Sequence, residues 1–159
     1  MIKNHKYKSN GNTVYSCIYQ VVWCSKYTRK VLDDEVVKRL KDIINTISIE
    51  NNVDIIEINI SNESCIKLIV SLDPSYGIAH FISHCKSRSA QILRKEFIHL
   101  KTKLPTMWSG SVLISTIGEM PSETSSKKFI SEQQTSERPR EKEKWKEYID
   151  SFKNGGKNG

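Results

Sequence analysis

Apolar and polar residues alternate along four stretches of the chain, and this period of two predicts strands. The first stretch spans 14–24 and places aromatic and β-branched residues on one side. An Ile-rich run over 53–61 predicts the second strand, and 65–72 predicts the third, after a turn at 61–64. The fourth predicted strand spans 108–117 and ends at a glycine.

Elsewhere apolar residues recur every three or four positions, which predicts helices. The first predicted helix is capped by Asp33 or Asp34 and runs to about Asn51. The second covers 78–97, and a polar loop with Pro105 follows over 101–107. A short helix is predicted over 122–134, and Pro139 opens a last amphipathic helix before a frayed, Gly- and Asn-rich end. The apolar face of that last helix carries Trp145, Tyr148, Ile149 and Phe152.

The predicted order is β-α-β-β-α-β followed by two helices. This order is typical of the split βαβ arrangement, an α+β fold in which an antiparallel sheet carries its helices on one face. On the third strand, Ile66, Leu68 and Val70 share one face and are expected to pack on the helices. Cys65 and Lys67 then point to the opposite face, about 7 Å apart along the strand.

Composition agrees with one compact domain. The chain has 159 residues, of which 37% are hydrophobic and 27% charged. No apolar run approaches the roughly 18 residues of a membrane span, and Met1 to Ser9 lack the apolar core of a secretory signal. We therefore expect a cytoplasmic protein.

Charge is segregated along the chain, whose formal net charge is +7. Residues 1–32 hold six bases and no acid, 33–63 hold eight acids against three bases, and 86–103 hold six bases against one acid. Such separation favours a basic face that meets a polyanion. A merely soluble surface with uneven helices is the alternative.

The four cysteines are scattered and include no CxxC pair. Cys17, Cys24, Cys65 and Cys85 allow three disulfide connectivities, and their spacing favours none. Because we expect a cytoplasmic protein, we predict buried reduced thiols.

Several stretches, in order and without large gaps over residues 6–152, together resemble one family. They are Tyr15-Ser-Cys-Ile-Tyr-Gln-Val-Val-Trp-Cys-Ser-Lys-Tyr-Thr-Arg-Lys-Val-Leu32, Asp73-Pro-Ser-Tyr-Gly77, Lys86-Ser-Arg-Ser-Ala-Gln-Ile-Leu-Arg-Lys-Glu-Phe97, Leu100-Lys-Thr-Lys-Leu-Pro-Thr-Met-Trp108, Ile114-Ser-Thr-Ile-Gly118 and Arg138-Pro-Arg-Glu-Lys-Glu-Lys-Trp145. The chain resembles the small insertion-sequence transposases of the 200/605 family, the TnpA type of the single-tyrosine HUH class. The resemblance implies a ferredoxin-like or RRM-like fold, a dimer that joins two sheets, and action on single-stranded DNA hairpins at transposon ends.

The resemblance also implies a divalent metal, Mg²⁺ or Mn²⁺, held by a His-x-His pair and a glutamine. The matching positions here are Cys65, Lys67 and Gln133, so only the glutamine is retained. An ammonium cannot ligate a dication, and a thiol suits Mg²⁺ poorly. We therefore expect no tightly bound cofactor.

The family nucleophile is a tyrosine that forms a 5′-phosphotyrosine link. Its position, four residues before the glutamine, is Phe129. A phenyl ring keeps packing and stacking ability but has no hydroxyl. No intact catalytic residue is therefore predicted.

Basic residues in the matched stretches are the predicted DNA contacts. Lys26, Arg29 and Lys30 flank Tyr27, a mixture that suits phosphate contact and base stacking. Lys67 is hypothesised to hold a phosphate by charge where the metal sits in the family, and a merely solvated lysine is the alternative. The long helix adds Lys86, Arg88, Arg94 and Lys95.

These observations predict a domain over 1–134 that includes the helix at the nucleophile position, and a C-terminal helix and tail over 135–159. The favoured function is hairpin DNA binding without cleavage, as a homodimer or as a heterodimer that disables an active relative. Two alternatives stay open: an active transposase with an atypical site, and an RNA-binding module.

Overall fold

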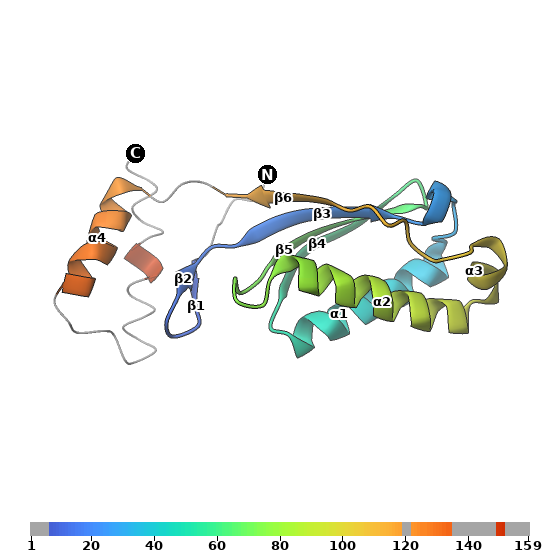
Figure 1. The fold of residues 1–159 in the computed structure, drawn as a ribbon, viewed down its shortest axis with the longest axis horizontal. Helices are drawn as coiled ribbons and strands as arrows, with labels where there is room; N and C mark the ends of the chain where they lie inside the picture. The colour runs from blue at the N-terminus through green and yellow to red at the C-terminus, as the bar shows by residue number, and fades with distance from the viewer. Residues whose placement is uncertain (1–6, 119–121, 135–148, 152–159) are drawn as a thin grey trace. The chain divides into compact units, whose positions relative to one another are not determined.

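The computed structural model describes residues 7–118, 122–134 and 149–151. The chain divides into two compact units, one formed by residues 17–117 and the other by 1–16 together with 118–159. The larger unit contains the sheet and the two long helices (Figure 1). In the smaller unit, β1 (Lys8–Ser9) pairs with β2 (Val14–Tyr15), and α4 spans Glu123–Gln134.

The larger unit has the predicted order of elements. It contains β3 (Ile18–Cys24), α1 (Asp34–Glu50), β4 (Asp54–Ser61), β5 (Cys65–Ser71), α2 (Ile78–Glu96), α3 (Ile98–Lys103) and β6 (Leu113–Ile117). The strands form one antiparallel sheet in the order β4-β5-β3-β6. The split βαβ fold and its α+β class are confirmed.

Both long helices cover the same face of the sheet (Figure 1). Helix α1 begins where the Asp33 side chain accepts a hydrogen bond from Val36 N at 3.0 Å. The core lies between these helices and the sheet. Its strand contribution is Val21 and Trp23 from β3, and Ile66, Leu68 and Val70 from β5.

The boundaries differ from the prediction at three places. The first predicted strand is interrupted after Tyr15, so that β2 and β3 are separate. Residues 98–103, predicted in part as loop, form α3, because Leu100 is buried and anchors one helical turn. The last strand begins at Leu113 rather than Trp108. Trp108 makes an isolated bridge with Ser25, and residues 109–112 separate it from the strand. Its buried indole donates a hydrogen bond to Ser89 Oγ at 2.9 Å.

The two edges of the sheet have different chemistry. Strand β6 pairs with β3 alone among the described strands and carries exposed apolar side chains, Leu113 and Ile114. Strand β4, at the other edge, carries the exposed carboxylates Asp54 and Glu57. A β-bulge interrupts its pairing with β5 between Ile55 and Glu57. The predicted C-terminal helix falls mostly on 135–148 and 152–159, outside the described residues.

Candidate nucleic-acid interface

Alternation along β5 separates a buried face from an open one. Ile66, Leu68 and Val70 are fully buried beneath the helices, as predicted. Cys65 and Lys67 lie on the opposite, helix-free face and are partly exposed. The structure therefore places Cys65 and Lys67, which the family resemblance matches to metal-ligand positions, on the same accessible face of the sheet.

Cys65 is not a free thiol, and our prediction of reduced cysteines is wrong for both Cys24 and Cys65. Its Sγ is bonded to that of Cys24, and their Cα atoms lie 4.0 Å apart. The antiparallel register makes Cys24 the direct partner of Cys65 across β3 and β5. Sequence spacing does not reveal this contact, because strand register is decided by long-range pairing. Cys17 and Cys85 remain free thiols.

Lys67 occupies the middle of the open face. Its register partners are Val22 on β3 and Asn59 on β4. The carboxylate of Glu57, on the same strand as Asn59, accepts a hydrogen bond from Asn59 Nδ2 at 2.6 Å. Within residues 7–118, 122–134 and 149–151, no hydrogen bond or ion pair involves the Lys67 ammonium. It is therefore available to an anionic ligand.

These residues do not fit the divalent metal that the family resemblance implies. The Cys65 sulfur is committed to a disulfide, and a lysine ammonium repels a dication. Among the described residues there is also no group of three or more His, Cys, Asp or Glu side chains that could hold a metal ion. The open face thus offers a positive charge where metal chemistry needs neutral or anionic ligands.

A groove of about 530 Å³ lies where β3 leaves the sheet. Val22, Cys24 and Leu113 contribute to its wall, as do Lys26 and Tyr27 of the turn η1 (Lys26–Thr28). Val22 is also the register partner of Lys67, so the groove and the lysine are neighbours on the open face. A cationic side chain, an exposed ring and a hollow together suit an unpaired nucleotide.

Tyr27 presents its ring to solvent with cations beside it. Tyr27 is 65% exposed, which is unusual for a tyrosine, so its ring does not serve the packing of the core. Lys26 Nζ lies 5.2 Å and Arg29 Cζ 5.4 Å from the ring centroid. This arrangement gives stacking and phosphate contact at one place, as the sequence predicts.

The backbone of this turn is held in an uncommon conformation. Tyr27 and Thr28 have φ values of 58° and 50°, in the left-handed region that β-branched and aromatic residues rarely adopt. Ser25 stabilises the turn, since its N–H donates to Ser64 O at 2.8 Å and its Oγ donates to Arg29 O at 2.6 Å. Lys26 N donates to Met107 O at 3.0 Å. The strain is thus offset by bonds from three segments, a pattern typical of functional turns.

Two predicted arginines meet at one segment next to this turn. Arg29 Nη1 donates to Lys103 O, and Arg94 Nη2 donates to Leu104 O at 3.1 Å. The structure thereby brings Lys101 and Lys103 of α3 close to the predicted contacts. Sequence reasoning did not select these two lysines. The signal was present, because both belong to the basic block over 86–103.

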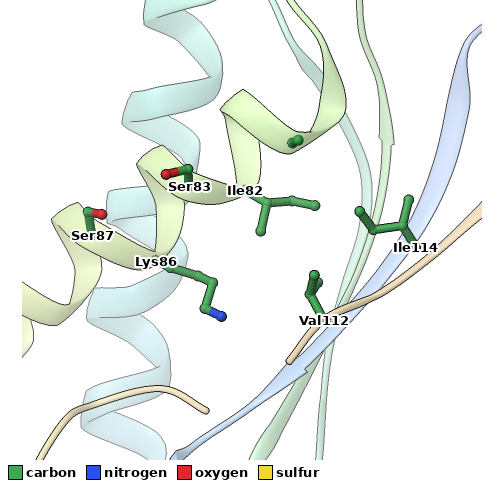
Figure 2. Close-up of a pocket in the computed structure, with 7 residues that line it drawn as sticks. Ile82, Ser83, Lys86, Ser87, Val112 and Ile114 are labelled. Atoms are coloured by element: carbon green, nitrogen blue, oxygen red, sulfur yellow. The ribbon is translucent and has the colours of Figure 1, made fainter. Parts of the chain in front are cut away.

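The remaining basic residues of α2 point elsewhere. Lys86 lines a second groove of about 370 Å³ between α2 and residues 112–114, where Figure 2 shows its side chain crossing toward Val112. Its Nζ donates to Ser109 O at 2.7 Å, and burial lowers its pKa. Arg88 is paired with Glu50 at 2.5 Å, and Lys95 is exposed. Helix α2 covers the face opposite Lys67, so these contacts do not share one surface with it.

Phe129 and Gln133 lie one helical turn apart on α4, as their spacing predicts. Phe129 is 38% exposed and Gln133 is exposed. Lys127, two residues before Phe129, forms an ion pair with Glu123 at 3.0 Å. The helix therefore presents a partly exposed phenyl ring at Phe129, the residue that the family resemblance matches to the nucleophile.

The larger unit is a ferredoxin-like domain whose sheet carries the partly exposed Lys67 on the face opposite α1 and α2. Residues 13–133 match the family described as transposase IS200 like. The ISDra2 transposase TnpA of Deinococcus radiodurans is 32% identical over 114 residues, which cover 70% of this chain and 81% of that protein. The IS200 transposase of Salmonella typhimurium is 25% identical over 114 residues, covering 70% and 74%.

A solved structure agrees with these sequence matches. The crystal structure of a candidate transposase from Deinococcus radiodurans R1 superposes with a TM-score of 0.64 at 28% identity, covering 79% of this chain and 97% of that one. The chain belongs to the IS200-like transposase family. No helix among the described residues is both long and apolar enough to cross a membrane.

Proposed function

We propose that this protein binds single-stranded hairpin DNA at the ends of an insertion sequence and does not cut it. The observation that carries the proposal is the state of the two family ligand positions on the open face. Cys65 is bonded to Cys24, and Lys67 presents an ammonium without a protein partner among the described residues. A phosphate is the ligand that suits such a charge.

The nucleophile position supports loss of cleavage independently. Attack on a phosphodiester needs an oxygen that can be deprotonated, and Phe129 has none. Another tyrosine would have to reach hydrogen-bond distance of the phosphate without the helix that the family uses. Two separate parts of the chemistry are therefore missing, while the charged surface is present.

The proposed DNA contacts fall into two groups. Lys26 and Tyr27 line the groove at the end of β3, Arg29 lies beside the Tyr27 ring, and Lys67 is the register partner of the groove residue Val22. Lys30, which follows Arg29 in the chain, is exposed. Tyr27 provides a stacking surface, and the cations provide phosphate contacts. On α2, Arg94 donates to Leu104 O and Lys95 is exposed, whereas Lys86 and Arg88 would have to leave Ser109 and Glu50 to contact DNA.

The decisive experiment is a binding and cleavage assay on end-like hairpins with Mg²⁺ or Mn²⁺. We expect retained hairpin binding and no covalent protein–DNA adduct. An adduct mapped to any tyrosine of the wild-type chain would instead identify an active transposase with an atypical site. Tighter binding to a matched RNA hairpin would identify an RNA-binding module.

Replacing Lys67 by alanine is expected to weaken hairpin binding roughly tenfold, because it removes one charge-assisted contact to phosphate. Lys67→Arg should retain most of the affinity. Lys38→Ala, an exposed lysine on α1, is the matched control and should have no effect. Fluorescence anisotropy at moderate salt measures all three. Unchanged affinity in Lys67→Ala would contradict the proposed role of this lysine.

We also propose that the chain forms a homodimer through the β6 edge. A strand edge that pairs with no other described strand and carries exposed apolar side chains favours pairing with a second copy. Two copies related by a twofold axis would extend one sheet across both. We also propose a cytoplasmic location, because the proposed ligand is the DNA of the insertion sequence.

A mixed dimer with an active relative is expected to be inactive. If each site combines one chain's helix with the other chain's sheet, one mixed site lacks the tyrosine and the other lacks both histidines. Titrating this chain into the relative's cleavage reaction should reduce the cutting rate in proportion to heterodimer formed. Full cutting in the presence of demonstrated heterodimers contradicts this.

A further inference from the structure

Cys24 and Cys65 lie where solvent and the proposed ligand both have access. Each is partly exposed on the helix-free face, and Cys24 contributes to the wall of the groove next to Tyr27. Lys67 follows Cys65 by two residues on the same face. The other two thiols differ, because Cys85 is buried and its pKa is raised to about 12 by burial, while Cys17 is bonded to no other cysteine.

The Cys24–Cys65 disulfide also lies directly before the turn that carries Tyr27. Cys24 is the last residue of β3, and Ser25 begins the segment that leads into η1. Ser25 N is bonded to Ser64 O, directly beside Cys65. The disulfide and this hydrogen bond therefore fix the same two strand ends. The positive φ values of Tyr27 and Thr28 are strained, so they require that the strand ends next to the turn are held in place.

We propose that Cys24 and Cys65 form a reversible thiol–disulfide exchange site whose oxidised state favours DNA binding. The inference rests on the proposed function and adds its regulation. The reductant is a dithiol of the cytoplasmic class, or two equivalents of a small thiol such as glutathione.

The exchange is balanced as follows. A reductant thiolate attacks one sulfur of the pair, the Cys24–Cys65 bond breaks, and the released cysteine takes up a proton. The second reductant thiol then attacks the mixed disulfide and releases the other cysteine, which is also protonated. Two electrons pass to the protein, and the reductant leaves as its own disulfide. Oxidation by a disulfide of the same class reverses each step.

Reduction weakens DNA binding because it loosens the turn η1, and not because it changes the charge of the surface. Breaking the bond adds no charge while both thiols stay protonated, so Lys67 keeps its surroundings. It does remove the covalent tie at the root of η1, which allows the strained turn to relax. A binding surface that must be ordered on association binds more weakly than one already fixed. We expect roughly fivefold weaker hairpin binding in the reduced form.

Two measurements on the full-length, tag-free chain test the proposal. Thiol counting and mass spectrometry after equilibration in glutathione buffers report the redox state. Anisotropy with a fluorescent end-like hairpin reports affinity for the oxidised and reduced forms. Cys65→Ser and Cys24→Ser should bind like the reduced wild type and ignore the reductant. Cys17→Ser, which removes a partly exposed free thiol, is the matched control and should respond as wild type does.

A two-electron transition in glutathione buffer, together with the fivefold affinity change, supports the proposal. A pair that stays oxidised in excess reduced glutathione is structural and overturns it, as does a pair that never oxidises. Equal affinity of the two forms also overturns the regulatory role. If neither form binds hairpins, the proposed function fails, while the thiol count still decides whether the exchange site exists.

Discussion

A variant carrying Cys65→His, Lys67→His and Phe129→Tyr is expected to cut end-like hairpin DNA and to remain covalently attached to it. The first two changes place two imidazoles on one face of β5, where alternate residues converge on one ion. The third supplies the missing hydroxyl on α4. A metal acting as a Lewis acid is worth several kcal/mol, so the triple variant is expected to cut about a thousandfold or more faster than Phe129→Tyr alone. Denaturing gels detect the adduct.

Two further variants make this result interpretable. Cys65→His with Lys67→His but without the tyrosine should bind metal and form no adduct. Phe129→Tyr alone should also form none, because no ion polarises the phosphate. The triple variant loses the disulfide, so its fold must first be checked by circular dichroism at low temperature. A folded, hairpin-binding triple variant that makes no adduct would show that further parts of the site have been lost.

Loss of the Cys24–Cys65 bond is expected to lower the free energy of unfolding by about 4 kcal/mol on the chain-entropy model. The bond closes a loop with a sequence separation of 41 residues that contains all of α1 and β4. Without the bond, the unfolded chain has a higher conformational entropy, which favours unfolding. Urea unfolding of wild type and of Cys65→Ser, both without reductant, measures the difference.

Controls distinguish the effect of losing the disulfide from the effect of replacing a cysteine side chain. Wild type in reductant should match Cys65→Ser, and Cys24→Ser should match both. Cys17→Ser removes a thiol without breaking a bond and should stay close to wild type. If the oxidised and reduced wild type unfold at the same urea concentration, the bond contributes nothing to stability.

Local patterns predicted most of this fold and the orientation of its candidate site. Alternation over residues 65–72 predicted that Ile66, Leu68 and Val70 would be buried, and the structure confirms this. The same alternation placed Lys67 on the open face. Helical spacing in α1 and α2 was strong enough to give both helices nearly complete.

The rest depended on contacts between distant residues. The Cys24–Cys65 bond requires the register of β3 against β5, which no local spacing encodes. Trp108 was predicted as strand from its apolar neighbourhood, yet its indole is drawn inward by Ser89, 19 residues away in sequence. The position of Lys103 beside the predicted contacts could not be predicted either, because Arg29, which donates to the Lys103 carbonyl, is 74 residues away in sequence.

The unequal edges of the sheet have a consequence for solubility. If β6 of one copy paired with β4 of the next, subunits would add head to tail and grow into an open filament. The exposed carboxylates of Asp54 and Glu57 discourage such growth, since an apolar strand gains little from docking on a charged border. The proposed assembly through two β6 edges would instead stop at a closed pair, in which the apolar edge of each copy is covered and cannot start aggregation.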